Sequence, residues 1–157
     1  MPTILPIVTG KDTDILHRST DRVKDPLQSD IQNLLPVMFD SLRAANGIGL
    51  AAPQIDQSIR LAVVEVENER LVLVNPKITS FSREKILFEE GCLSLPGQFF
   101  LIERSERITV RYQDETGKEK KRKATGLLAI VIQHEVDHLD GILIADRYER
   151  DKRKRRT

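Results

Sequence analysis

A single segment near the C-terminus constrains the fold of this 157-residue chain more than any other feature. Residues 127–132 (LLAIVI) are apolar without interruption, and residues 133–139 (QHEVDHL) follow them directly. A helix that is hydrophobic on nearly all sides is normally buried inside a domain. We therefore predict a buried central helix over residues 127–139, ended by Gly141, with the other elements packed around it.

The polar residues of this helix have the spacing of a metal site. His134 and His138 lie four residues apart, so their imidazoles share one face and can reach the same ion. Glu135 is not needed as a ligand, which leaves its carboxylate free to take a proton from a water molecule at the ion. Two solvated histidines are the alternative interpretation. The apolar residues before the motif disfavour it, because burial of these groups is costly without a metal.

Cys92 is the single cysteine of the chain. A free cysteine by itself is most simply a small buried hydrophobic residue. Its setting differs here, because Gly91 allows the backbone to approach a ligand closely and Glu90 and Ser94 flank it with hydrogen-bonding groups. Two imidazoles, one thiolate and an open position for water describe a catalytic metal site. Such a site accepts Zn²⁺, Fe²⁺, Co²⁺ or Ni²⁺.

A third segment, residues 47–54 (GIGLAAPQ), has few bulky side chains. Taken alone it is most simply a helix C-cap followed by a turn. A phosphate-binding loop fits poorly, because no Gly-Lys-Ser or Gly-Lys-Thr follows. An extended backbone edge that binds a peptide fits better, with Gln54 pointing into the cleft.

The remaining pattern predicts an α+β domain. Apolar residues at helical spacing predict a helix over residues 30–45, which either begins near Leu35 or kinks at Pro36. Strands are expected at the following residues: 61–66 and 71–74 as a hairpin that Pro76 ends, a short strand near 86–88, 108–112, and a lysine-rich edge strand at 118–123. We therefore expect antiparallel strands packed around the central helix, with an additional N-terminal helix.

Charge divides the chain into two parts. The net charge is +1, but residues 147–157 carry +5 and residues 1–146 carry −4. We predict a single catalytic metallohydrolase domain over residues 1–146 and a disordered basic tail over residues 147–157. The tail is either a solvated end or a loose attachment to ribosomal RNA through phosphate contacts, without sequence-specific nucleic-acid binding.

The same features predict a location. No apolar run is long enough to span a membrane, so we expect no membrane partner, and the N-terminus lacks the pattern of a secretory signal. A thiolate ligand must stay reduced. We predict a cytoplasmic protein, or an organellar one after removal of a targeting peptide.

Together, the three segments resemble the signatures of the peptide deformylases, G-x-G-L-A-A-P-Q, E-G-C-L-S and Q-H-E-x-D-H-L. All three are present without substitution, in the family's order, and the resemblance runs from the first predicted helix to about Arg147. It implies a metal-dependent hydrolase that removes the N-formyl group from the N-terminal methionine of newly made polypeptides and releases formate. It also implies N-formyl-methionyl peptides as the substrate and Fe²⁺ as the ion in the cell, with zinc forms less active.

The resemblance assigns roles to residues of this chain. It implies metal ligation by Cys92, His134 and His138, and Glu135 as general base and acid. The side-chain amide of Gln54 and the backbone N–H of Leu93 would stabilise the developing oxyanion. The residues implied in substrate binding are the backbones of Gly49 and Gly91, a methionine pocket lined by Ile48, Phe88, Leu127, Ile130 and Val131, and Arg104 beside that pocket.

Three departures and two rival functions accompany the resemblance. Ile102 and Glu103 replace the Val-Pro of many relatives, Phe88 is bulkier than expected, and the long C-terminal helix of many bacterial members is replaced by the short basic tail. One rival is an H-E-x-x-H metallopeptidase. Its third ligand would have to come from the acids after His138, which are Asp140, Asp146, Glu149 and Asp151. The other is a zinc-stabilised RNA-binding module, which lacks a fourth ligand.

Overall fold

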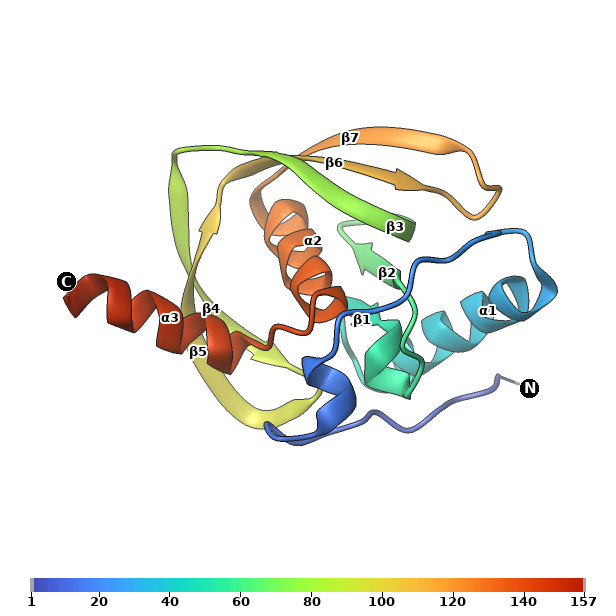
Figure 1. The fold of residues 1–157 in the computed structure, drawn as a ribbon, viewed down its shortest axis with the longest axis horizontal. Coiled ribbons are helices and arrows are strands. Elements are labelled where there is room, and N and C mark those ends of the chain that lie inside the picture. Colours follow the sequence, from blue (N-terminus) through green and yellow to red (C-terminus); the bar gives the residue numbers. More distant parts are fainter. Residues whose placement is uncertain (1, 157) are drawn as a thin grey trace.

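The computed structural model describes residues 2–156 and confirms the α+β class (Figure 1). The helices are α1 (Ser29–Ala44), α2 (Gly126–Leu139) and α3 (Ile144–Arg156), with short 3-10 helices η1 (Asp14–His17) and η2 (Ala52–Ile55). The strands are β1 (Gly49–Ala51), β2 (Leu61–Val66), β3 (Glu69–Phe81), β4 (Lys85–Cys92), β5 (Leu95–Ser105), β6 (Arg107–Gln113) and β7 (Glu119–Thr125). They form an antiparallel sheet of order β1-β2-β3-β6-β7 and a separate antiparallel pair, β4-β5.

Helix α2 lies in the centre of the fold, as its apolar sequence predicts (Figure 1). Its side chains Leu128, Ile132 and Val136 pack against the five-stranded sheet, in one buried cluster with Ile108 and Val110 of β6. The sheet therefore holds one side of α2. The polar residues of the motif are carried on the same rigid helix.

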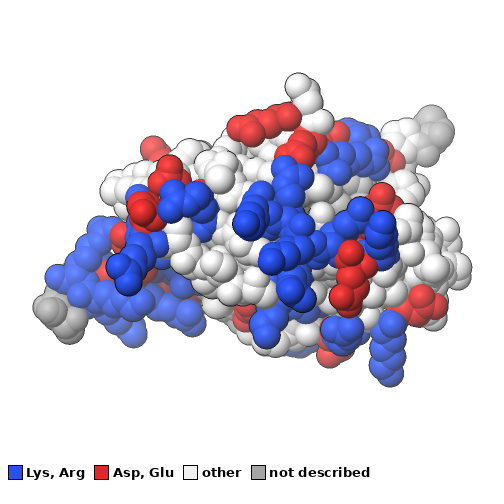
Figure 2. Space-filling model, turned by 90° about the horizontal axis from the view of Figure 1, so that it is seen from above, with Lys and Arg blue, Asp and Glu red and all other residues white. Residues whose placement is uncertain are grey.

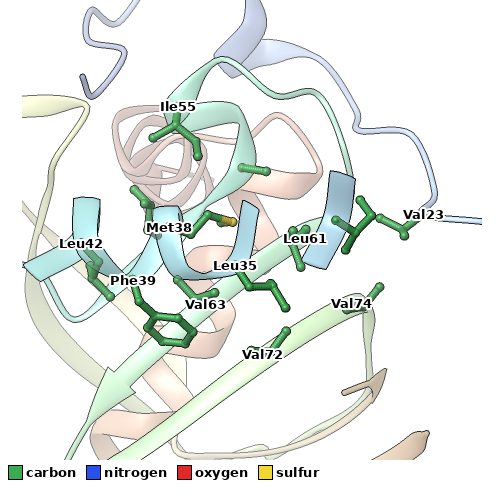
Figure 3. Close-up of a cluster of buried hydrophobic side chains, with 13 residues drawn as sticks. Val23, Leu35, Met38, Phe39, Leu42, Ile55, Leu61, Val63, Val72 and Val74 are labelled. Atoms are coloured by element: carbon green, nitrogen blue, oxygen red, sulfur yellow. The ribbon is translucent and has the colours of Figure 1, made fainter. Parts of the chain in front are cut away.

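Helix α1 covers the other part of the sheet. Figure 3 shows Leu35, Met38 and Phe39 of α1 lying over Val63 of β2 and Val72 of β3, within one buried cluster. The helix begins at Ser29, so the expected alternative start near Leu35 is wrong and Pro36 lies in the helix interior. Burial of this apolar face offsets the hydrogen bond that the proline cannot donate.

Two strands differ from the sequence prediction. Pro76 does not end the second strand, because β3 continues to Phe81. The register shifts between Val74 and Lys77, and such a bulge tolerates a residue without an N–H. Strand β5 was not predicted at all, and it pairs with β4 along most of its length.

The C-terminal segment is a helix, so the prediction of a disordered tail is wrong. At the start of α3, Asp146 Oδ2 accepts a hydrogen bond from the N–H of Leu143 at 2.9 Å. Ile144 is buried with neighbouring apolar side chains, and the ring of Tyr148 lies 5.3 Å from that of Phe100. These contacts fix the first turns of α3, and the basic residues extend from them. The helix also crosses the predicted domain boundary at residue 146.

None of the helices in the described part of the chain has the length and hydrophobicity that crossing a membrane requires.

Candidate metal centre

Cys92 at the end of β4 meets His134 and His138 of α2 in space. Among residues 2–156, these three offer ligand atoms that all lie within 4.8 Å of one another. Cys92 Sγ lies 3.3 Å from His138 Nε2, which lies 3.2 Å from His134 Nε2. A tetrahedral ion with ordinary bond lengths needs ligand separations of about 3.3–3.6 Å. The three side chains therefore fit one divalent metal ion.

A carboxylate behind the site orients one of the ligands. Glu90 Oε1 lies 2.8 Å from His134 Nδ1, so the other ring nitrogen of His134 faces the cluster. A hydrogen bond of this kind fixes the tautomer and the orientation of a metal-binding histidine. Burial opposes ionisation of Glu90, but hydrogen bonds from Arg104 and His134 outweigh it and hold the pKa of Glu90 below its ordinary value.

The same carboxylate belongs to a chain of ion pairs that reaches α3. Arg104 donates to both oxygens of Glu90 at 2.8 and 2.9 Å, and to Asp137 Oδ2 at 2.6 Å. Asp137 Oδ1 in turn accepts from Arg147 Nη2 at 2.6 Å. Arg104 and Glu90 are almost completely buried. These ion pairs thus connect the first turns of α3 to the imidazole of His134.

Glu135 lies beside this centre and is almost completely buried. Burial raises the pKa of Glu135 to about 7, the range in which a carboxyl group both accepts and donates protons near neutral pH. Its Oε1 is buried and has no hydrogen-bond partner in the described structure. Its Oε2 lies against Gly49, where an added Cβ would come within 2.4 Å of it. A glycine at position 49 is therefore needed for Glu135 to occupy this place.

Gln54 approaches the centre from η2. Its Oε1 accepts a hydrogen bond from the N–H of Ala51 at 2.9 Å. This contact distinguishes the oxygen of the side-chain amide from its nitrogen. Its Nε2 donates to Ser94 Oγ at 3.1 Å and lies 3.8 Å from Cys92 Sγ. The donor end of the amide consequently faces the metal ligands.

A cavity of about 490 Å³ opens onto these groups. It is lined by seven of the eight residues expected to bind substrate, namely Ile48, Gly49, Phe88, Gly91, Leu127, Ile130 and Val131. Gln54, Leu93, Cys92, His134 and Glu135 line it as well. Arg104, the eighth, does not line the cavity, because its guanidinium is enclosed by Glu90 and Asp137. Its expected place beside the pocket is therefore wrong.

Strand β5 contributes cavity residues that the sequence prediction missed. Pro96, Gln98 and Phe99 line the cavity, and a Cβ at Gly91 would come within 2.9 Å of the Phe99 ring. The apolar run of residues 99–102 (FFLI) was the available signal. Glu103, one of the expected departures from the family pattern, pairs with Leu87 inside the β4–β5 ladder, so this segment is regular strand.

The rival functions lose their structural basis. Cys92 takes the third ligand position that a metallopeptidase would need to fill after His138. Two of the acids there are engaged elsewhere, since Asp140 pairs with Arg60 and Asp146 accepts from the Leu143 N–H. A purely structural zinc module is also disfavoured, because the ligands of the described chain number three and two of them, Cys92 and His134, line an open cavity.

Comparisons with known proteins agree with this site. A family model described as polypeptide deformylase matches residues 4–154. A peptide deformylase of Dictyoglomus thermophilum is 46% identical over 134 residues, which cover 85% of this chain and 87% of that protein. One of Thermodesulfovibrio yellowstonii is 45% identical, covering 90% of this chain and 87% of the other.

Solved structures give the same result for the fold. The crystal structure of a peptide deformylase from Thermotoga maritima has a TM-score of 0.88 and 37% identity, covering 92% of this chain and 97% of that one. A peptide deformylase from Synechococcus elongatus in complex with actinonin also has a TM-score of 0.88, with 38% identity over 92% of this chain and 78% of that one. This chain belongs to the peptide deformylase family.

Proposed function

We propose that Glu135, Gln54 and the backbone N–H of Leu93 carry out the reaction of this enzyme beside an ion held by Cys92, His134 and His138. The enzyme removes the N-formyl group from the N-terminal methionine of newly made polypeptides and releases formate. One observation carries the proposal. The three ligand atoms lie within 4.8 Å of one another, and two of these ligands, Cys92 and His134, line the same cavity as Glu135 and Gln54.

In this proposal, Glu135 transfers the proton. A divalent ion at the site would supply a Lewis acid that makes water easier to deprotonate near neutral pH. Glu135 has an unpartnered Oε1 and a pKa raised by burial to about 7, so it can accept the proton of the attacking water. It then delivers that proton to the nitrogen of the leaving amine, which frees the N-terminus of the peptide.

Two donors are proposed to stabilise the oxygen on which negative charge develops. They are Gln54 Nε2 and the backbone N–H of Leu93, both from residues that line the cavity. The contacts of Gln54 with Ala51 and Ser94 support this role, because they fix its amide before substrate arrives. Such preorganisation is what makes a hydrogen-bond donor effective in a transition state.

The substrate is proposed to bind as an extended peptide with its methionine side chain in an apolar pocket. Ile48, Phe88, Leu127, Ile130 and Val131 provide apolar lining suited to an unbranched thioether side chain. Gly49 lies on β1 and Gly91 on β4, and each of these strands is paired on one side only, which leaves an edge for strand-like pairing with the peptide.

We infer Fe²⁺ as the native ion and the cytoplasm as the location. Iron rests on the resemblance to the family, since zinc would bind these ligands more tightly than iron and selection therefore depends on supply. Zn²⁺, Ni²⁺ and Co²⁺ suit the same three ligands. The location rests on Cys92, which must stay reduced to act as a thiolate ligand; an organelle would serve equally.

The ribosome is proposed as a partner through α3. Lys152, Arg153 and Arg155 are exposed on this helix, and their charge suits loose contacts with the phosphates of ribosomal RNA. Because α3 is docked by its first turns, these side chains are presented on an ordered helix.

Substitution of Gln54 by alanine tests the proposed oxyanion site. We expect Gln54→Ala to lower kcat for formate release by about 10²–10³-fold with little change in KM, because the lost hydrogen bond forms mainly in the transition state. Formate released from formyl-Met-Ala-Ser is measured together with bound metal. Gln98→Ala, which also removes an amide that lines the cavity, is the matched control and should stay near the wild-type rate. Wild-type turnover of Gln54→Ala would exclude the assigned role.

A further inference from the structure

The outer face of the five-stranded sheet carries three positive charges in a row. Lys77 of β3 is directly opposite Arg111 of β6, and Arg111 is directly opposite Lys121 of β7. We call these three residues the basic row. Like charges directly opposite one another destabilise a sheet. Within residues 2–156, no side-chain hydrogen bond or ion pair involves any of the three. No direct ion pair within the described residues offsets this repulsion.

Two hollows adjoin the basic row: one is mostly basic, and the other, which Lys77 also lines, has mixed charge and includes Glu103, Asp137, Asp140 and Asp151. Lys123 lies on the same face, opposite Thr109 and two residues along β7 from Lys121. A hollow of about 410 Å³ adjoins the row and is lined by Arg22, Asn75, Lys77, Arg111, Tyr112, Gln113, Glu119, Lys120 and Lys121. Glu119 is the single acidic residue among them. Figure 2, which views the molecule from the side of β6 and β7 in Figure 1, shows basic side chains gathered over the middle of this face.

Protection of the sheet edge explains only part of this pattern. Lysines on an edge strand prevent pairing with another chain, and β7 is an edge strand. That accounts for Lys121 and Lys123. Lys77 also lies where β3 is paired on one side only, because its pairing with β2 ends at Val74. Arg111 is not accounted for, because β6 is paired with β3 on one side of it and with β7 on the other. A ligand that neutralises all three members of the row would account for the whole pattern.

We propose that the basic row binds the phosphate backbone of single-stranded RNA. Neighbouring strands are about 4.8 Å apart, so the row spans roughly 10 Å, which suits successive phosphates better than a single anion. The row is exposed and offers charge without a buried donor, as is usual for contacts with a polyanion. Single-stranded nucleic acids bind basic grooves that follow their backbone, and the basic row with its adjoining hollow offers such a groove. The choice of RNA rests on the proposed function, since new polypeptides are made in RNA-rich surroundings.

RNA bound at this face leaves the catalytic cavity open. Helix α2 separates the two, because its residues Leu128, Ile132 and Val136 pack against the inner face of the sheet. Leu127, Ile130 and Val131 of the same helix line the cavity. Lys77 lines a second hollow together with Lys154 of α3, so the basic row lies next to the basic residues of that helix. Both surfaces can hold the enzyme near RNA without blocking its substrate.

Fluorescence anisotropy of a labelled oligouridylate, titrated with the intact enzyme at several salt concentrations, tests this proposal. The test variant is Lys77→Gln/Arg111→Gln/Lys121→Gln. The control is Lys11→Gln/Arg18→Gln/Arg83→Gln, which removes the same charge from exposed positions outside the row. We expect the slope of log Kd against log salt to fall by about 2 in the test variant, because each lost single-strand phosphate contact contributes about 0.7. The control variant should keep the wild-type slope.

Two further readouts separate the possible outcomes. Relief of repulsion should raise the midpoint of thermal unfolding of the test variant, and its formate release should match that of the wild type. Absence of oligouridylate binding, an equal loss of slope in both variants, or tighter binding to phosphatidylserine vesicles than to the oligomer would overturn the proposal. Because formate release is measured separately, failure of the RNA site cannot be mistaken for failure of the deformylase reaction.

Discussion

Glu135→Gln is expected to lower kcat/KM for formate release by about 10²–10⁴-fold, the usual contribution of a general acid–base group. Glutamine keeps the shape of the side chain but accepts no proton from water. Glu135 is suited to this role by its burial, by the raised pKa of about 7 and by an oxygen without a hydrogen-bond partner. Because Glu135 is not among the ligand residues, the variant should still bind one ion per chain.

A matched variant separates proton transfer from a general effect of charge. Glu89 lines the same cavity but is exposed, and Glu89→Gln makes the same change of charge. We expect it to stay within a few-fold of the wild-type rate. Steady-state formate release and the bound metal are measured for both variants, which distinguishes proton transfer from a general effect of charge. If Glu135→Gln kept more than a tenth of the wild-type activity, another group would have to move the proton.

Arg104→Met is expected to lower the free energy of unfolding by about 3–5 kcal/mol. The substitution leaves two carboxylates, Glu90 and Asp137, without the guanidinium that pairs with both. Glu90 is almost completely buried, so its charge would be poorly solvated once its partner is lost. Urea unfolding of metal-free protein measures the change, with an unchanged m-value as evidence that the same transition is observed.

Loss of Arg104 should also weaken metal binding. Glu90 orients His134, and disturbance of such a partner typically weakens metal binding by about 10–100-fold. Arg107→Met is the control, since Arg107 pairs with Glu84 at the surface and its removal should change stability far less. Equal unfolding curves for Arg104→Met and the wild type would show that the buried chain of ion pairs contributes little to the fold.

The catalytic core could be predicted from the sequence because its signals are local. The spacing of His134 and His138 follows from helical geometry, and the apolar residues before them predict a buried helix. The structure adds Cys92 to the cluster and Gln54 to the cavity, as the motifs predicted.

The missed elements depend on contacts between distant parts of the chain. Strand β5 alternates exposed Phe99 and Leu101 with buried Ile102, but its exposed positions are apolar as well, so the sequence lacks the alternation of apolar and polar residues that identifies a strand. Helix α3 is strongly charged and depends on Ile144 and Tyr148 packing against other elements. Neither arrangement follows from the hydrophobic periodicity of a local window of sequence.

The predicted place of Arg104 beside the pocket was wrong because it, too, depends on contacts between distant parts of the chain. Its partners Glu90 and Asp137 lie 14 and 33 residues away in the sequence, and the structure joins all three in one buried cluster. The motifs contain Glu90 and Asp137 but do not reveal that an arginine connects them. A residue expected to contact substrate is thereby found to support the metal ligand instead.

Anaerobic titration of the metal-free enzyme with Fe²⁺, with formate release from formyl-Met-Ala-Ser as the readout, tests the central claim most directly. We predict that activity rises in proportion to added ion, saturates at one ion per chain, and leaves the Met-Ala-Ser tripeptide intact. Cys92→Ala should lose tight binding and with it the saturation point, because one of three ligands is gone. Formate release that does not depend on the ion, or cleavage between Met and Ala, would contradict the account.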